Sequence, residues 1–372
     1  MSVPVVKFNV KDQTEFFKEL RKRVNKYFKE NNISRYANFS MKFKSAFMIC
    51  LYFAPLVLML TGVVANVWLV LLMWALMGFG MSGIGLSIMH DANHGSYSKN
   101  QKVNNAMGWL IHFIGGYKEN WKIQHNVLHH SFTNIEGFDE DIEIGIMRFS
   151  PTQKRRILHR FQIFYAPFLY GLMTVYWCSA KDFIQLFRYN KKDLLKGQGL
   201  TLAKGFFQIL ANKIWYFALL LVIPSLLVDL PWWQSFIGFG IMHFICGLIL
   251  SFVFQPAHVI EETEFYDTDE NGSVDNNWAI HQVKTTANFA NGSYFFSWFI
   301  GGLNFQIEHH LFPNICHIHY KKLSKIVQET TKEFNLPYHQ HKTFFGAIKS
   351  HLTLLNQLGT GKYERNLANN KG

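Results

Sequence analysis

Histidine is the residue type whose placement in this chain points to chemistry. The 372 residues include 17 histidines. Eight of them stand in three short clusters and at one single position, namely His90 and His94 in HDANH, His125, His129 and His130 in HNVLHH, His309 and His310 in QIEHH, and His258 in QPAHV. Residues four apart share one face of a helix, so each of the first two clusters can present two imidazoles to one place. Adjacent histidines point about 100° apart on a helix, which suits two metal ions side by side better than one.

Eight imidazoles are too many for a single tetrahedral zinc ion and are about right for two ions. Imidazole binds iron, copper or zinc, so the ligand type alone does not identify the metal. A metal-bound histidine usually donates its other N–H to a carboxylate or carbonyl that fixes the ring. The polar residues beside the clusters that we expect to do this are Asp91, Asp139, Asp141 and Asn304. We expect the remaining histidines to be either core residues (His112, His243, His281) or solvated ones (His159, His317, His319, His339, His341, His351).

The histidine clusters lie next to the ends of long apolar stretches. A bilayer core of roughly 30 Å needs about 20 helical residues. The stretches that meet this length predict spans at about residues 45–63, 66–89, 212–228 and 232–254. A fifth apolar patch at 161–180 has basic flanks, and we expect it to lie in the membrane interface. His90 follows the second predicted span and His258 follows the fourth, so we expect the metal site at the mouths of these helices.

Composition and charge agree with a membrane protein that has a sizeable polar part. Hydrophobic residues make up 49% of the chain and charged residues only 17%, against roughly a quarter in typical soluble chains, while the mean hydropathy is only +0.02. The net charge of +12 comes from Lys and Arg just outside the apolar stretches, and no nucleic-acid-binding motif is present. Their distribution predicts that both termini and the metal site are cytoplasmic, which requires an even number of crossings. The four cysteines show no metal-binding spacing.

The two ends of the chain are expected to lie outside the membrane. We divide the chain into an N-terminal cytosolic or interfacial arm (1–44), a membrane domain (45–320) and a C-terminal cytosolic tail (321–372). In the arm, residues 12–31 predict an amphipathic helix with Asp12 and Glu15 as a capping box. This helix either packs on the rest of the protein or lies on an anionic membrane surface. The fold class is therefore an all-α integral membrane protein with about four transmembrane helices and a cytosolic helical cap that carries a histidine-ligated di-metal site.

The three clusters resemble a known family. HDANH, HNVLHH and NFQIEHHLFPN are similar to the three histidine boxes of the membrane fatty acid desaturases, in order and in placement relative to the spans, from about residue 45 to 320. The third box begins with Gln306 instead of histidine, which resembles the front-end desaturases such as the linoleoyl-CoA (delta-6) type. The resemblance implies a di-iron centre with all eight histidines as ligands, and Gln306 as a weak additional ligand or the holder of a metal-bound water.

The resemblance also implies an activity and its partners. The expected reaction is the O2-dependent insertion of a double bond into a fatty acyl chain, carried as acyl-CoA or acyl-lipid and reached from the membrane. Many relatives carry a fused cytochrome b5 domain with an HPGG motif, which does not occur here, so we expect a separate electron donor, ferredoxin or cytochrome b5. A hydroxylase or monooxygenase of the same superfamily is the nearest alternative. A metal transporter or zinc-dependent receptor is a remote one, because transporters place their ligands inside the bilayer.

Overall fold

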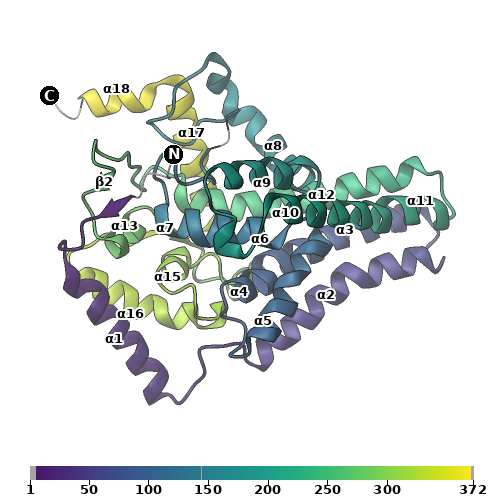
Figure 1. Cartoon of the computed structure of the whole chain (residues 1–372), viewed down its shortest axis with the longest axis horizontal. Coiled ribbons are helices and arrows are strands. Elements are labelled where there is room, and N and C mark those ends of the chain that lie inside the picture. Colours follow the sequence, from purple (N-terminus) through teal and green to yellow (C-terminus); the bar gives the residue numbers. More distant parts are fainter. Residues whose placement is uncertain (1–5, 144, 370–372) are drawn as a thin grey trace. The chain divides into compact units, whose positions relative to one another are not determined.

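The computed structural model describes residues 6–143 and 145–369, which are mostly helical (Figure 1). The described part divides into two compact units, each built from several stretches of the chain. The first unit holds residues 37–123 and 168–251, and the second holds residues up to 36, 124–167 and 252 onward. Each unit has its own internal packing.

The first unit consists of helices. Its elements are α2 (Phe39–Leu60), α3 (Val67–Gly83), η1 (Ile84–Ile88), α4 (Met89–Asn93), α5 (Gln101–Gly108), η2 (Trp109–Ile114), α6 (Lys118–Trp121), η5 (Trp177–Lys181), α9 (Asp182–Lys191), η6 (Lys196–Gln198), α10 (Leu202–Phe217), η7 (Ala218–Val222) and α11 (Ile223–Leu227). Three elements begin in one unit and end in the other, namely η3 (Lys122–His129), α8 (Gln162–Tyr176) and α12 (Trp233–His258).

The first two long helices form a closely packed antiparallel pair. The Asn66 side chain caps α3 by accepting from the backbone N–H of Trp68, at 3.0 Å, as expected of an N-cap residue. Gly80 lets the two backbones touch, because a Cβ there would lie only 2.6 Å from the backbone nitrogen of Tyr52. The break between the helices falls at residues 61–66, and α2 ends at Leu60. The first helix thus ends three residues before the predicted span 45–63 does, and the second begins within one residue of the predicted start at 66.

Five helical runs among the described residues are long and apolar enough to cross a membrane. They are Phe39–Leu60, Val67–Asn93, Ile157–Lys191, Leu202–Leu227 and Trp233–His258. Four of them overlap the four predicted spans along most of their length. The fifth contains the patch at 161–180, and its helical run is longer than predicted because the helix continues through the charged residues Lys181 and Asp182.

A buried ion pair explains why charged residues did not end these helices. The Lys213 ammonium in α10 contacts the Asp182 carboxylate at the start of α9, and both side chains are buried. The same ammonium donates to the carbonyl oxygens of Gly115 at 2.6 Å and Trp177 at 3.1 Å. Because the charges are paired and hydrogen-bonded within the first unit, they can lie inside helices that are otherwise apolar.

The second unit combines short helices with two small parallel sheets. Its elements are β1 (Lys7–Phe8), α1 (Thr14–Glu30), α7 (His130–Phe132), η4 (Ile157–Phe161), β2 (Ser273–Val274), α13 (Trp278–Lys284), β3 (Ala287–Phe289), α14 (Tyr294–Phe299), α15 (Gln306–Leu311), η8 (His317–His319), α16 (Tyr320–Glu333), β4 (His339–His341), α17 (Phe344–Thr360) and α18 (Lys362–Asn369). Strand β1 pairs with β2, and β3 pairs with β4 in the register Ala287 to His339. The second pairing joins the C-terminal segment to the stretch just before the third histidine cluster.

The N-terminal amphipathic helix is α1, and its apolar stripe is buried inside the second unit. Phe16, Leu20, Val24 and Phe28 share one core with residues of α13, α15 and α16, and Figure 1 shows α1 beside α16. Of the two readings of this helix, packing on the protein is therefore confirmed for the apolar face. The predicted capping box is wrong. The helix begins after Gln13, which has no side-chain cap.

Candidate metal centre

The second histidine cluster lies on a π-helical segment, which changes how its side chains are spaced. Element η3 is π-helical over Lys122–His129, and in such a segment hydrogen bonds run from residue i to i+5. Residues five apart then come to one side, and the Nε2 atoms of His125 and His130 are 3.3 Å apart. His129 remains near this side as well, because its ring stacks on that of His125 with centroids 5.4 Å apart. All three imidazoles of the cluster thus converge.

The third cluster brings two more imidazoles to the same place in the second unit. His309 and His310 lie on the short helix α15 and are buried. The Nε2 atom of His309 is 3.0 Å from that of His130. The ring of His310 stacks on that of His130 with a centroid separation of 4.4 Å. Both adjacent residues of α15 therefore approach His130, His309 through its Nε2 atom and His310 through the face of its ring.

His258, the last residue of α12, completes a second group of three imidazoles. The ligand atoms of His129, His258 and His310 all lie within 4.8 Å of one another, and all three residues are buried. The Nε2 atom of His258 has no hydrogen-bond partner among the described residues. A buried polar atom that lacks a partner is costly, so this nitrogen is placed for a group that the protein chain itself does not supply.

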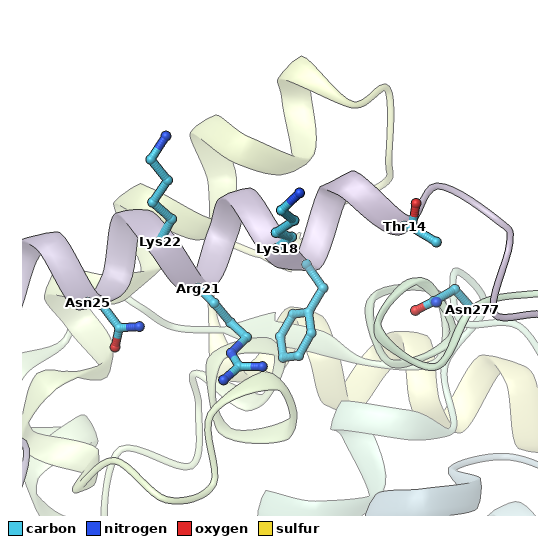
Figure 2. Close-up of a pocket in the computed structure, with 7 residues that line it drawn as sticks. Thr14, Lys18, Arg21, Lys22, Asn25 and Asn277 are labelled. Atoms are coloured by element: carbon cyan, nitrogen blue, oxygen red, sulfur yellow. The ribbon is translucent and has the colours of Figure 1, made fainter.

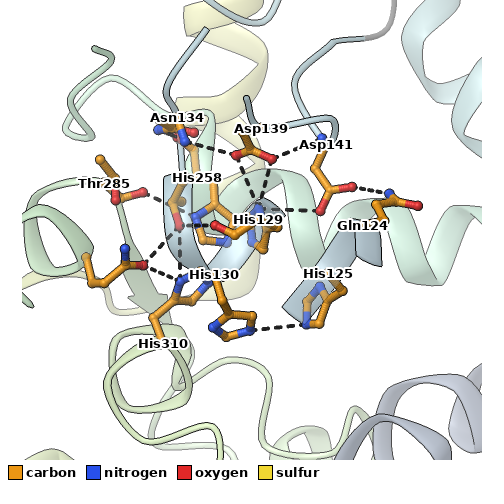
Figure 3. A network of polar contacts seen from close by, with 12 residues as sticks. Gln124, His125, His129, His130, Asn134, Asp139, Asp141, His258, Thr285 and His310 are labelled. Carbon is orange, nitrogen blue, oxygen red and sulfur yellow. Dashed lines mark hydrogen bonds and ion pairs between the residues drawn. The ribbon is translucent and has the colours of Figure 1, made fainter. Parts of the chain in front are cut away.

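The outward nitrogens of these rings have protein partners that fix their orientation (Figure 3). Nδ1 of His129 lies 3.1 Å from the Asp139 carboxylate, and Nδ1 of His258 donates to the Thr285 carbonyl at 3.2 Å. Nδ1 of His310 lies 2.7 Å from Oε1 of Gln282. Donation from Nδ1 leaves the lone pair on Nε2, which is the atom that would bind a metal.

Electrostatics around His129 favour its contact with the carboxylates. Burial lowers the pKa of the His129 imidazole, but Asp139 and Asp141 outweigh it and raise that pKa to about 9. Burial raises the pKa of Asp139, yet the contact with His129 and two backbone N–H groups bring it below its usual value. Asp141 also accepts from the Gln124 side chain. Asp139 is thus a buried anion held against the imidazole that faces the other two ligands.

The first cluster lies in the first unit. His90 and His94 lie on and at the end of α4, which follows the π-helical turn η1. Their ring centroids are 4.8 Å apart, so the spacing of four does bring the two imidazoles together. The Trp121 ring flanks both, at 5.6 and 5.8 Å. Asp91 is buried between them on the same helix.

Two predicted site residues of the third box, Asn304 and Gln306, make no side-chain hydrogen bond to a histidine within the described residues. The Asn304 amide donates to Oγ of Ser297 at 2.9 Å and to the carbonyl of Ala290, so it holds the loop before α15. Gln306 is completely buried. Neither its Nε2 nor its Oε1 has a hydrogen-bond partner within the described part of the chain, which makes this amide, like His258, available to an added group.

Several residues that hold the site were not predicted. Asn134 links His258 to the carboxylate that orients His129, because its Nδ2 donates to the His258 carbonyl at 2.8 Å and its backbone N–H donates to Asp139 at 2.9 Å. It has a φ of 57°, which asparagine tolerates better than most residues. The Tyr320 hydroxyl lies 3.2 Å from Nδ1 of His309. The sequence signal for Asn134 was its place directly after HNVLHHSFT, whereas that for Tyr320 was absent.

Some histidines predicted to be solvated are buried. His159, His317, His319 and His351 are all shielded from solvent, and the prediction for them was wrong because the polar segments around them fold onto the second unit. Nδ1 of His351, for example, lies 2.7 Å from the Val259 carbonyl. His243 and His281 are buried as expected. Position in a basic stretch was therefore a poor guide to the exposure of these side chains.

The donor set in the second unit fits a pair of transition-metal ions. Metal–imidazole bonds of about 2.1 Å put neighbouring nitrogens roughly 3.0–3.4 Å apart in octahedral or tetrahedral geometry. The nitrogen separations of 3.0 and 3.3 Å around His130 match this range. The unpartnered nitrogen of His258 and the group that it forms with His129 and His310 provide a second place. Such nitrogen-rich donor sets bind iron, zinc or copper.

Comparison with known proteins agrees with this chemistry. The sequence pattern of the family described as fatty acid desaturase matches residues 66–342. The sn-1 linoleoyl-lipid 6-desaturase of Arthrospira platensis is 39% identical over 346 residues, which cover 92% of this chain and 92% of that protein. The protein of the same name from Synechocystis is 35% identical, with 92% and 95% covered.

A third relative extends the range of organisms. The acyl-lipid (8-3)-desaturase of Physcomitrium patens is 36% identical over 95% of this chain and 73% of its own length. Each of these similarities spans all three histidine clusters of the present sequence. By the family match and by these relatives, the chain belongs to the fatty acid desaturase family.

Proposed function

We propose that this protein is a front-end acyl-lipid desaturase that inserts a double bond at carbon 6 of a linoleoyl chain. As a fatty acyl desaturase it is an oxidoreductase. The family implies a di-iron centre, and we assign as its ligands the histidines of the three clusters and His258, with Gln306 beside them. The observation that carries the proposal is the convergence of buried imidazole nitrogens. One of them, Nε2 of His258, has no hydrogen-bond partner among the described residues.

The protein's own residues account for how such a centre is held. Iron supplies the redox chemistry with O2, which no side chain in the chain can perform. Asp139, Thr285 and Gln282 orient the imidazoles through their outward nitrogens. Burial of all these groups excludes water from the site, which protects a reactive centre from side reactions.

The choice of a lipid-linked substrate and of carbon 6 comes from the relatives. Two of them are named for a linoleoyl-lipid substrate and for position 6, and a third for an acyl-lipid substrate. Gln306 supports the same assignment, because it stands where the third box resembles the front-end type. An amide oxygen binds metal only weakly but can hold a water or a neighbouring ligand.

Feeding a host that lacks such desaturases tests the position of the double bond. Cells that express the protein and receive linoleate are expected to form a product with a new double bond between the carboxyl group and the existing ones, in the sn-1 chain of the glycerolipids. Mass spectrometry of derivatised esters, after hydrolysis specific to sn-1, locates the bond. A host expressing His130→Ala serves as the inactive control. New unsaturation only on the methyl side, or only in the middle of fed stearate, would contradict the front-end assignment and leave the desaturase reading intact.

We propose further that the chain crosses the membrane four times, with the metal centre and both termini in the cytoplasm. Lys and Arg crowd the arm, the middle loop and the tail, and the tight turns between spans carry none, which favours this orientation. The helical run at Ile157–Lys191 then lies in the interface, since an even number of crossings is required. Reporter fusions placed after Gly372 and near Asn66 are expected to report opposite compartments. The same compartment for both would overturn the count of four.

A further inference from the structure

The outer side of α1 carries a groove that no part of the proposed reaction has used so far. The groove has a volume of about 450 Å³, and we call it the α1 groove (Figure 2). Its lining residues are Thr14, Phe17, Lys18, Arg21, Lys22 and Asn25 of α1, with Asn277 from the start of α13. Figure 2 shows Lys18 and Lys22 projecting to one side of the helix and Arg21 to the other. All of these residues belong to the second unit.

The α1 groove is electropositive. Helix α1 has six basic and three acidic residues in the sequence TEFFKELRKRVNKYFKE. Lys18 and Lys22 reach Glu15 and Glu19 at 3.3 and 3.5 Å, but their side chains are 76% and 77% exposed, so these ion pairs are weak and are screened by water. The Arg21 guanidinium lies 5.8 Å from the Phe17 ring centroid. A net positive surface with hydrated cations attracts an acidic partner and speeds its association.

A short chain of rings leads from the floor of the α1 groove to a metal-ligating histidine. The ring of Phe17, which lines the groove, lies 5.5 Å from that of Trp278, centroid to centroid. The Trp278 indole N–H donates to the backbone carbonyl of His130 at 3.1 Å. Trp278 is half-buried, so it stands between the surface and the site. The hydrogen bond reaches the backbone of His130 and so joins the groove to a residue of the proposed metal centre.

A membrane surface is a poor occupant for the α1 groove. Helices that bind in the lipid interface insert an apolar face beside their basic one. The apolar face of α1, which includes Phe16, Leu20 and Val24, is already buried against α13, α15 and α16. What remains outside is charged and polar, which suits the rim of a transient protein–protein contact.

We propose that the α1 groove is the docking site of an acidic one-electron carrier protein, and that electrons pass from it by way of Trp278 to His130. The inference rests on the proposed function, which needs a reductant. In each turnover two carrier molecules are oxidised by one electron each. The acyl chain loses two hydrogens, two protons come from water, and O2 is reduced to two water molecules. The carrier is of the ferredoxin or cytochrome b5 class.

Charge reversal in the groove tests the docking. Arg21→Glu with Lys22→Glu is expected to lower kcat/KM for reduced plant-type ferredoxin, or for reduced cytochrome b5, by about tenfold or more at low salt. The difference in kcat/KM between wild type and variant should shrink as the KCl concentration is raised, because salt screens the attraction between exposed charges on the two proteins. Lys342→Glu with Lys349→Glu is the matched control, since both residues are exposed on the same unit and away from α1. Equal loss in the control would overturn the assignment to the groove.

A chemical reductant separates docking from damage to the site. Single-turnover product formation after reduction with dithionite and methyl viologen should be unchanged in Arg21→Glu with Lys22→Glu, and iron per chain should stay at the wild-type value. A fall in both the dithionite and the carrier reactions would mean a disturbed site and would overturn the proposal. Full activity of the double variant with the carrier would overturn the proposal as well. Binding of the carrier to phospholipid-free protein in detergent must also weaken, and a loss seen only with anionic vesicles would point to a lipid surface instead.

Replacement of Trp278 tests the route. Trp278→Leu is expected to bind the carrier normally and keep its iron, but to lose most of the fast phase of carrier oxidation in stopped flow. Trp278→Phe, which keeps a ring, should recover part of that phase. Equal rates in wild type and Trp278→Leu would remove Trp278 from the route. If the wild-type protein oxidises the carrier with O2 but desaturates no acyl chain, the proposed function fails and the docking site stands.

Discussion

Replacing His310 by alanine should abolish desaturation and strip most of the iron from the purified protein. His310 is completely buried, and its ring lies 4.7 Å from that of His258 and 5.0 Å from that of His129. Its Nδ1 is held by Gln282, so Nε2 is the atom aimed at the other imidazoles. Loss of even an outer partner of a ligand typically lowers metal affinity or activity 10–100-fold, and we expect loss of the ligand itself to exceed roughly 100-fold.

The measurement is iron per chain by mass spectrometry of the metal, with product analysis on the same preparation. Wild-type protein is expected to hold about two irons, because the imidazoles form two groups. His341→Ala is the control, since His341 is outside the clusters and lies 3.3 Å from the Glu262 carboxylate, and it should keep both iron and activity. Near wild-type turnover in His310→Ala would remove this residue from the ligand set. Zinc as the sole metal in an active wild-type preparation would contradict the di-iron assignment.

Replacing Lys213 by methionine should destabilise the first unit strongly. The change leaves the Asp182 carboxylate buried without its partner and leaves the Gly115 and Trp177 carbonyls without the ammonium donor. Breaking a buried ion pair on one side typically raises the free energy of the folded state by about 3–5 kcal/mol. The expected result is a low yield of monodisperse protein and a lower melting temperature in detergent. Intrinsic fluorescence measures this temperature.

A double replacement is the matched control for this prediction. Lys213→Met combined with Asp182→Leu removes both charges, and replacing a buried pair by apolar residues of similar size is often close to neutral. The double variant should therefore melt well above Lys213→Met alone. If Lys213→Met has the wild-type melting temperature, the pair does not stabilise the unit. If the double variant is as unstable as the single one, the carbonyl contacts and not the charge pair carry the effect.

The sequence predicted the identity of the clustered imidazoles better than their geometry. Hydropathy and periodicity alone predict four of the long helices and the amphipathic helix α1. The reasoning for HNVLHH assumed 3.6 residues per turn, whereas η3 is π-helical. In that geometry His125 pairs with His130 as well as stacking on His129. No local propensity signals a π-helix, because it depends on packing around the segment.

Helix ends were the second limit, and they failed for an electrostatic reason. The third predicted span began at residue 212, after polar residues, but α10 begins at Leu202. Asn212 and Lys213 look like a polar boundary in the sequence, but both side chains donate to backbone carbonyls of the loop at Gly115 and Gly116. Because these two residues bond to a loop about a hundred residues away in the chain, the helix continues through them instead of starting there. Such pairing cannot be read from a single sequence.

The burial of α1 has a consequence for the order of events during synthesis. Phe16, Leu20, Val24 and Phe28 are synthesised well before their packing partners in the range Ala279–Val327. Contacts so distant along the chain form late, so the apolar stripe of α1 is uncovered while all the apolar helices are being made. Exposed apolar surface of this kind aggregates. The nascent arm therefore needs a temporary cover, from a chaperone or from the membrane surface, until the last segment of the second unit has emerged.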